Sequence, residues 1–174
     1  MSADITLVLG GARSGKSRHA EGLVTSAPGP RVYIATAQIW DEEMAERVAR
    51  HKDDRGTGWT TVEEPLELPG ALRRHALAGT NVLVDCLTLW LSNLMMAEAD
   101  VPAKAADLLG ALADADGRVV LVSNEVGLGI VPDNALARRF RDHAGRLHQD
   151  VAAVASRVVF VAAGLPLVLK GDGK

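Results

Sequence analysis

The sequence predicts an α/β fold in which a mostly parallel sheet is covered by helices on both faces. Short apolar runs alternate along the chain with longer amphipathic stretches, the order typical of strands joined by crossover helices. The runs are also continuously apolar, as expected for strands that are buried on both faces. With 174 residues, of which 48% are hydrophobic, the chain is expected to form a single domain over residues 1–174.

Five apolar runs are predicted strands, and a sixth run is a further candidate. Each run is short, and a helical pattern or turn residues separate it from the next. The predicted strands are 5–9 (ITLVL), 32–36 (VYIAT), 81–85 (NVLVD), 119–123 (VVLVS) and 158–162 (VVFVA), with 165–170 (LPLVLK) as the sixth candidate.

The amphipathic stretches between these runs are predicted helices. The clearest helix spans 133–155, because apolar residues from Leu136 to Val154 recur at spacings of three and four, and Asp133 is its expected N-cap. The least regular stretch, 55–66, is expected to be a loop. The other predicted helices lie near 16–26, 41–54, 67–78, 86–97 and 103–115.

The charge pattern and the single cysteine exclude several classes of protein. The formal net charge is −3 and no long run of like charges occurs, so we expect no nucleic-acid partner. Cys86 is the sole cysteine, so no intrachain disulfide can form. The longest apolar run, 158–169, is too short to span a membrane and contains a proline. No cationic segment precedes the first apolar run, and a cytoplasmic location without a signal peptide is expected.

A glycine-rich stretch, GGARSGKS, follows the first predicted strand and precedes the first predicted helix. It matches the pattern G-x-x-x-x-G-K-[ST]. Glycines let backbone N–H groups turn toward a phosphate, and the positive end of the helix dipole faces the same anion. The lysine reaches the β- and γ-phosphates, and the hydroxyl binds Mg²⁺. The sequence therefore predicts a P-loop NTPase-like nucleotide site formed by Gly10, Gly11, Ala12, Arg13, Ser14, Gly15, Lys16 and Ser17.

Asp85 is the expected second anchor for Mg²⁺, beside Ser17, because it ends an apolar strand. A cap at the end of the strand is the alternative role for this carboxylate. The motifs that the sequence lacks disfavour one class of P-loop protein. No glycine stands three positions after Asp85, and 123–127 has no base-reading Lys or Asp, so a GTPase of the common type is disfavoured. A phosphotransferase acting on a small molecule fits best.

Five stretches together resemble one family, the bifunctional adenosylcobinamide kinase/adenosylcobinamide-phosphate guanylyltransferases of cobalamin biosynthesis. The resemblance implies that a nucleoside triphosphate, ATP or GTP, phosphorylates the aminopropanol hydroxyl of adenosylcobinamide. It also implies that GMP then passes from GTP to that phosphate and pyrophosphate is released. The family is associated with a homotrimer. The stretches that carry the resemblance are 7–21, 32–56, 59–65, 82–94 and 122–149.

The resemblance also assigns site residues to this chain. The family's guanylylated histidine falls on His51, in the stretch RHKDDRG, so His51 and Lys16 are the expected catalytic residues. Arg50 stands where some members of the family carry a second histidine. Beyond the phosphate loop, the family's nucleotide contacts fall on Ala35, Thr36, Ala37, Lys52, Asp53, Asp54, Arg55, Glu63 and Asp85.

The residues alone leave two interpretations of His51 open. On a helix beginning near residue 41, Met44, Val48 and His51 lie three and four residues apart, so the histidine extends an apolar stripe and is equally suited to a core position. With the resemblance, a neutral imidazole nitrogen is expected to attack the α-phosphorus of GTP. Its other ring nitrogen needs an acceptor, for which Asp53, Asp54 and a backbone carbonyl are candidates.

Two alternative functions stay open from the sequence. One is a P-loop kinase for another small hydroxyl compound, with a structural His51. The other is a nucleotide-binding regulatory module that acts through a partner, although few residues remain outside the sheet and its helices to form an effector surface. Of the three functions, the two-step family reaction alone predicts that label on the α-phosphate of GTP becomes covalently attached to the protein.

Overall fold

The computed structural model describes residues 4–38, 42, 45–46 and 56–172. Within these residues, seven strands form one sheet in the order β3-β2-β4-β5-β1-β6-β7. All neighbouring strands are parallel except β6 and β7, which are antiparallel. The strands are β1 (Ile5–Gly10), β2 (Arg31–Ala35), β3 (Trp59–Glu63), β4 (Asn81–Asp85), β5 (Arg118–Asn124), β6 (Arg157–Ala162) and β7 (Leu165–Lys170).

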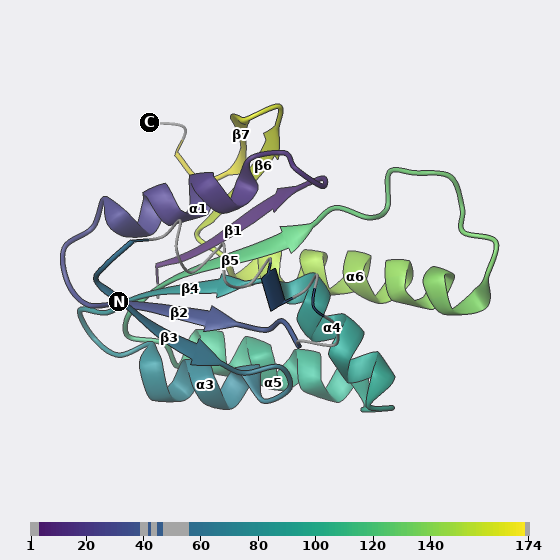
Figure 1. Ribbon diagram of the computed structural model, residues 1–174, viewed down its shortest axis with the longest axis horizontal. Helices are drawn as coiled ribbons and strands as arrows, with labels where there is room; N and C mark the ends of the chain where they lie inside the picture. The colour runs from purple at the N-terminus through teal and green to yellow at the C-terminus, as the bar shows by residue number, and fades with distance from the viewer. Residues whose placement is uncertain (1–3, 39–41, 43–44, 47–55, 173–174) are drawn as a thin grey trace.

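Helices cover both faces of the sheet, and this arrangement confirms the predicted fold class (Figure 1). One face carries α1 (Lys16–Thr25), which follows directly on the loop after β1. The opposite face carries the other named helices, α3 (Leu68–His75), α4 (Leu87–Met96), α5 (Val101–Ala113) and α6 (Ala135–Val154).

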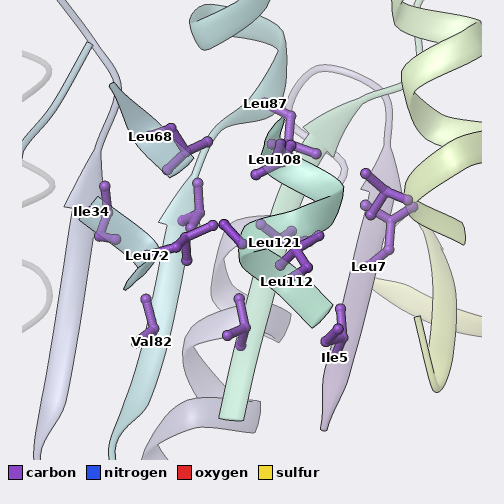
Figure 2. Close-up of a cluster of buried hydrophobic side chains, with 14 of the residues drawn as sticks. Ile5, Leu7, Ile34, Leu68, Leu72, Val82, Leu87, Leu108, Leu112 and Leu121 are labelled. Atoms are coloured by element: carbon purple, nitrogen blue, oxygen red, sulfur yellow. The ribbon is translucent and has the colours of Figure 1, made fainter. Parts of the chain in front are cut away.

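The larger hydrophobic cluster lies between the sheet and the four helices of that second face. Leu72 of α3 and Leu112 of α5 pack toward Leu121 of β5, and all three side chains are fully buried (Figure 2). Burying a leucine of this kind contributes about 1.5–3 kcal/mol. A smaller cluster on the other face joins Ala20 and Val24 of α1 to the strands. The inner strands are therefore buried on both faces, as their continuous apolar runs predicted.

Two predictions about local structure were wrong. Residues 59–63, expected within a loop, form β3, which pairs with β2 at one edge of the sheet. This edge strand was missed because none of its residues is fully buried, so its sequence WTTVE lacks the continuous apolar run of the inner strands. The N-cap of α6 is Asn134 instead of Asp133, because the Asn134 side chain accepts the backbone N–H of Ala137 at 2.8 Å.

Other predictions agree with the structure or lie beyond it. The candidate strand 165–170 is β7. The predicted helix 41–54 lies outside the described residues, apart from positions 42, 45 and 46. Within the described residues, no helix combines the length and apolar character needed to cross a membrane.

The parallel register aligns the carboxyl ends of the strands along one edge of the sheet. Glu63, Ala35 and Asp85 share one row across β3, β2 and β4. Asn124 of β5 pairs with Gly10 of β1, two residues beyond the level of that row. The carboxyl edge is where open α/β sheets bind ligands, and the candidate site lies there.

Candidate nucleotide site

The phosphate loop turns between β1 and α1, and the structure shows why it needs glycine at two positions. A Cβ atom on Gly10 would lie 2.5 Å from both the Ser14 Oγ and the Val161 carbonyl oxygen. Gly15 is the N-cap of α1 with φ of 91°, and a Cβ atom there would approach the Gly164 Cα to 3.1 Å. A side chain at either position would therefore strain or displace the loop.

The start of α1 is suited to bind an anion. The Lys16 ammonium donates to the Gly11 carbonyl oxygen at 3.1 Å, so its positive charge lies beside the loop. The first turn of α1 contains no acidic residue to oppose the helix dipole. The turn after β6 contacts the loop, and there the Gly164 N–H donates to the Ser14 carbonyl oxygen at 2.7 Å. The predicted residues 10–17 thus form one continuous cradle, with Ala12 and Arg13 exposed at its rim.

Asp85 lies across from the phosphate loop, half-buried at the end of β4. Its Oδ2 accepts the Ser17 hydroxyl at 3.4 Å and the Tyr33 hydroxyl at 3.1 Å. The two residues predicted to hold Mg²⁺ therefore present a hydroxyl and a carboxylate to the same space, and oxygen ligands of this kind are those that Mg²⁺ prefers. Sequence reasoning missed Tyr33; the only signal was one phenol hydroxyl within the apolar run VYIAT.

The predicted contacts at Ala35, Thr36 and Ala37 lie at the end of β2 and directly after it. Thr36 is fully buried, and its hydroxyl donates to the Cys86 carbonyl oxygen at 2.7 Å and accepts the Cys86 N–H at 2.9 Å. The Asn93 amide of α4 donates to the carbonyl oxygens of Thr36 and Pro65. The Thr36 side chain thus joins β2 to the start of α4, and of these three residues Ala37 is the most exposed.

Asn124 and Thr88 form a second polar pair near the loop, which was not predicted from the sequence. The Asn124 amide nitrogen donates to the Thr88 hydroxyl at 3.1 Å, and Thr88 Oγ1 lies 3.0 Å from the Cys86 Sγ. Burial raises the pKa of the Cys86 thiol, so the sulfur stays protonated within this contact. The sequence signal was the pair Ser123–Asn124, which ends an otherwise apolar strand.

Ser123 and its partner His148 support β5 from the other face of the sheet. Ser123 Oγ and His148 Nε2 are 2.7 Å apart, and both side chains are buried. Burial lowers the pKa of His148, although the carboxylate of Glu125 acts in the opposite direction. A neutral imidazole is therefore favoured in the folded protein.

The remaining predicted residues fall into two groups. Glu63 is exposed at the carboxyl end of β3, in the same register row as Ala35 and Asp85. It stands at the edge of the sheet that holds the phosphate loop. His51, Lys52, Asp53, Asp54 and Arg55 lie outside the described residues, and their roles stay predictions.

Comparison with known proteins adds a second, independent line of argument. The family model described as cobinamide kinase / cobinamide phosphate guanyltransferase matches residues 6–169. A Pseudomonas aeruginosa protein named bifunctional adenosylcobalamin biosynthesis protein CobP is 51% identical over 168 residues, covering 95% of this chain and 97% of that protein. The Salmonella typhimurium protein named bifunctional adenosylcobalamin biosynthesis protein CobU is 42% identical, covering 94% and 98%.

A more distant similarity was found among solved structures. The P4 protein from bacteriophage phi6, in complex with ADP, is 18% identical to this chain, with a TM-score of 0.49. The match covers 95% of this chain, which spans about half of that protein, 54% of its length.

Proposed function

The chain belongs to the cobinamide kinase / cobinamide phosphate guanyltransferase family, and on that premise we propose that one domain, residues 1–174, carries out both reactions. It is an enzyme of cobalamin biosynthesis that phosphorylates adenosylcobinamide and then transfers GMP from GTP to the product. The observation that carries the kinase assignment is the phosphate loop facing Asp85 across a Ser17–Asp85 contact of 3.4 Å.

In the phosphoryl transfer, the loop and Lys16 bind and orient the nucleoside triphosphate. The aminopropanol hydroxyl oxygen forms a bond to the γ-phosphorus while the bond to the β–γ bridging oxygen breaks. The hydroxyl proton passes to solvent and the nucleoside diphosphate leaves. Negative charge on the phosphoryl oxygens is stabilised by the Lys16 ammonium and by the N–H groups at the start of α1. The loop holds these donors in place before the reaction, so little reorganisation is needed.

The residues at the Asp85 side are suited to a bound Mg²⁺ ion. Ser17 and Asp85 supply hydroxyl and carboxylate oxygens on one side of the sheet. The Tyr33 hydroxyl, which donates to the same carboxylate, holds Asp85 in that orientation. When bound, the ion would neutralise charge on the β- and γ-phosphate oxygens.

In the guanylyl transfer, we assign the nucleophile to His51 on its family position and its chemistry. A neutral ring nitrogen bonds to the α-phosphorus of GTP and pyrophosphate leaves with the bonding electron pair. A phosphate oxygen of adenosylcobinamide phosphate then attacks the same phosphorus, GMP is transferred and the histidine is released. Lys52 and Arg55 carry the positive charge suited to stabilise the leaving pyrophosphate, and Asp53 or Asp54 is suited to orient the imidazole.

The decisive experiment is incubation with GTP labelled at the α-phosphate, followed by peptide mapping. Wild type should form an acid-labile, alkali-stable adduct on the peptide that contains RHKDDR. His51→Asn should abolish the adduct and guanylyl transfer while substantial kinase activity remains, because asparagine lacks the nucleophilic lone pair. His75→Asn, on α3, is the matched control and should leave both reactions intact.

Two results would contradict this assignment. Full adduct formation in His51→Asn would place the nucleophile at another residue. Loss of both reactions together with a lower melting temperature would make His51 a core histidine. A kinase for another small hydroxyl compound, or a regulatory module, would form no adduct even in the wild type.

We also propose a homotrimer in the cytoplasm, on the family resemblance. The cytoplasm supplies both nucleoside triphosphates. The edge strand β7 exposes Leu165, Leu167 and Leu169 at 71%, 61% and 57%, an apolar surface suited to subunit contact. Light scattering on the purified protein would measure the mass of the assembly, and a monomer would contradict the trimer.

A further inference from the structure

Asn124 ends β5 at a point that adjoins both the phosphate loop and Asp85. β5 lies between β1 and β4, the strands that lead into these two features. Asn124 pairs with Gly10, the first residue of the loop, and the next backbone N–H, that of Glu125, donates to the Gly10 carbonyl oxygen at 2.9 Å. Asp85 pairs instead with Val122. Asn124 is therefore two residues further along β5 than the level of Asp85, at the outer rim of the carboxyl edge.

The Asn124 side chain lies on the same side of the sheet as α1. Side chains alternate along a strand, and Val122 belongs to the cluster that packs beneath α1, so Asn124 faces that side too. The same alternation places Asp85 on the face of Leu83, which is in that cluster. An amide and a carboxylate from neighbouring strands therefore face the helix that begins at the phosphate loop.

Thr88 holds the Asn124 amide in one orientation. The amide nitrogen donates to Thr88 Oγ1 at 3.1 Å, and Thr88 is 5% exposed and in contact with Cys86. A primary amide has two N–H donors and one carbonyl acceptor. Within the residues that the structure describes, neither the second N–H nor the carbonyl oxygen of Asn124 makes a hydrogen bond. One half of the amide is thus anchored and the other half is available to a ligand.

From this geometry we propose that Asn124 donates its second amide N–H to the terminal phosphoryl group of a nucleoside triphosphate in the phosphate loop, and that Thr88 positions it. The inference deepens the proposed kinase reaction and rests on it. A neutral amide is suited to this place because it donates to phosphoryl oxygens without adding a second negative charge beside Asp85. A donor aimed at the terminal group contacts the triphosphate and not the diphosphate.

This difference between triphosphate and diphosphate supplies the test. The affinities of the protein for ADP and for a non-hydrolysable ATP analogue are measured by titration calorimetry with Mg²⁺. Asn124→Asp should weaken the binding of the ATP analogue by about 10–100-fold, because a hydrogen-bond donor to the phosphate is replaced by a carboxylate that repels it. ADP affinity should change by less than about threefold, since a terminal phosphoryl contact is absent from its complex.

Matched variants separate this role from a structural one. Asn134→Asp is the control. Asn134 is the N-cap of α6, and aspartate is an equally good N-cap, so this variant should change neither affinity. Asn124→Ala should lower the analogue-to-ADP preference in the same direction as Asn124→Asp. Thr88→Val should lower it less, because the donor stays in place but loses its anchor.

The kinase turnover provides a second measurement. Asn124→Ala should lower kcat by about a hundredfold, the size of effect expected for one lost donor to a developing charge. Equal weakening of ADP and analogue in both Asn124 variants would overturn the proposal, and so would unchanged analogue affinity. If Asn124→Asp fails to fold, Asn124→Ala carries the same comparison. If wild type does not phosphorylate adenosylcobinamide, the proposed function fails, while the preference for triphosphate over diphosphate still decides the role of Asn124.

Discussion

The two sides of the candidate nucleotide site are built in different ways. The phosphate-loop side consists of eight consecutive residues, 10–17, whose shape depends on two glycines and the start of one helix. The opposite side is assembled from separate strands, with Asp85 from β4, Asn124 from β5 and Tyr33 from β2. The first side is thus defined by local backbone conformation, whereas the second depends on strand order and register. Variants on the two sides should therefore fail in different ways.

The largest expected effect is on the loop side. Lys16→Ala should lower kinase kcat/KM by about a thousandfold and weaken nucleotide binding as well, because the ammonium acts on bound substrate and transition state alike. Steady-state kinetics and calorimetric affinity measure the two parts. Arg18→Ala, an exposed neighbour on α1, is the control. Turnover of Lys16→Ala near that of wild type at saturating nucleotide would contradict the assignment of the loop as catalytic.

On the assembled side, Asp85→Asn should leave the fold intact and change the dependence on Mg²⁺. The substitution is nearly isosteric but removes the negative charge, so about tenfold more Mg²⁺ should be needed for half-maximal kinase activity. A magnesium titration of the activity measures this shift, with the exposed Asp116→Asn as control. If added Mg²⁺ neither restores activity nor changes the defect, Asp85 is a cap at the end of β4.

The same contrast explains how much could be predicted from sequence. The inner strands and the phosphate loop were predicted because each is a contiguous pattern, an apolar run or a fixed motif. Asp85 was predicted as a metal ligand because it directly ends such a run. Tyr33 was not predicted, because its contact with Asp85 depends on β2 pairing with β4. Asn124 was not predicted, because its place beside the phosphate loop depends on β5 lying between β1 and β4. Sequence order does not reveal that neighbour relation, since β5 follows β4 in the chain but β1 is distant.

The smallest expected effect concerns His148, which contacts Ser123 of β5. Burial lowers the pKa of His148 in the folded protein below its ordinary value of 6.5, and the same holds for His19. The unfolded chain therefore binds protons more readily, so stability should fall as the pH drops below about 6.5. For the buried His148 the decrease is at most about 1.4 kcal/mol per pH unit. Urea unfolding at pH 7.5 and 5.5 measures this decrease.

Replacing the imidazole separates this effect from the general cost of acid. His148→Gln keeps a polar group near Ser123 but cannot titrate, so its stability should depend less on pH than that of wild type. His143→Gln, on the same helix, is the control. An identical pH dependence in wild type and His148→Gln would mean that other groups cause the loss of stability.

The turn between β6 and β7 has a consequence for the order in which the protein is made. Ala163 and Gly164 both have positive φ, and the Gly164 N–H donates to the Ser14 carbonyl oxygen beneath the phosphate loop. The ribosome synthesises the loop early and this support long afterwards. A nascent chain therefore carries the complete motif well before it can hold the motif in shape. The loop gains this hydrogen bond only once residue 164 has left the exit tunnel and β6 has paired with β1.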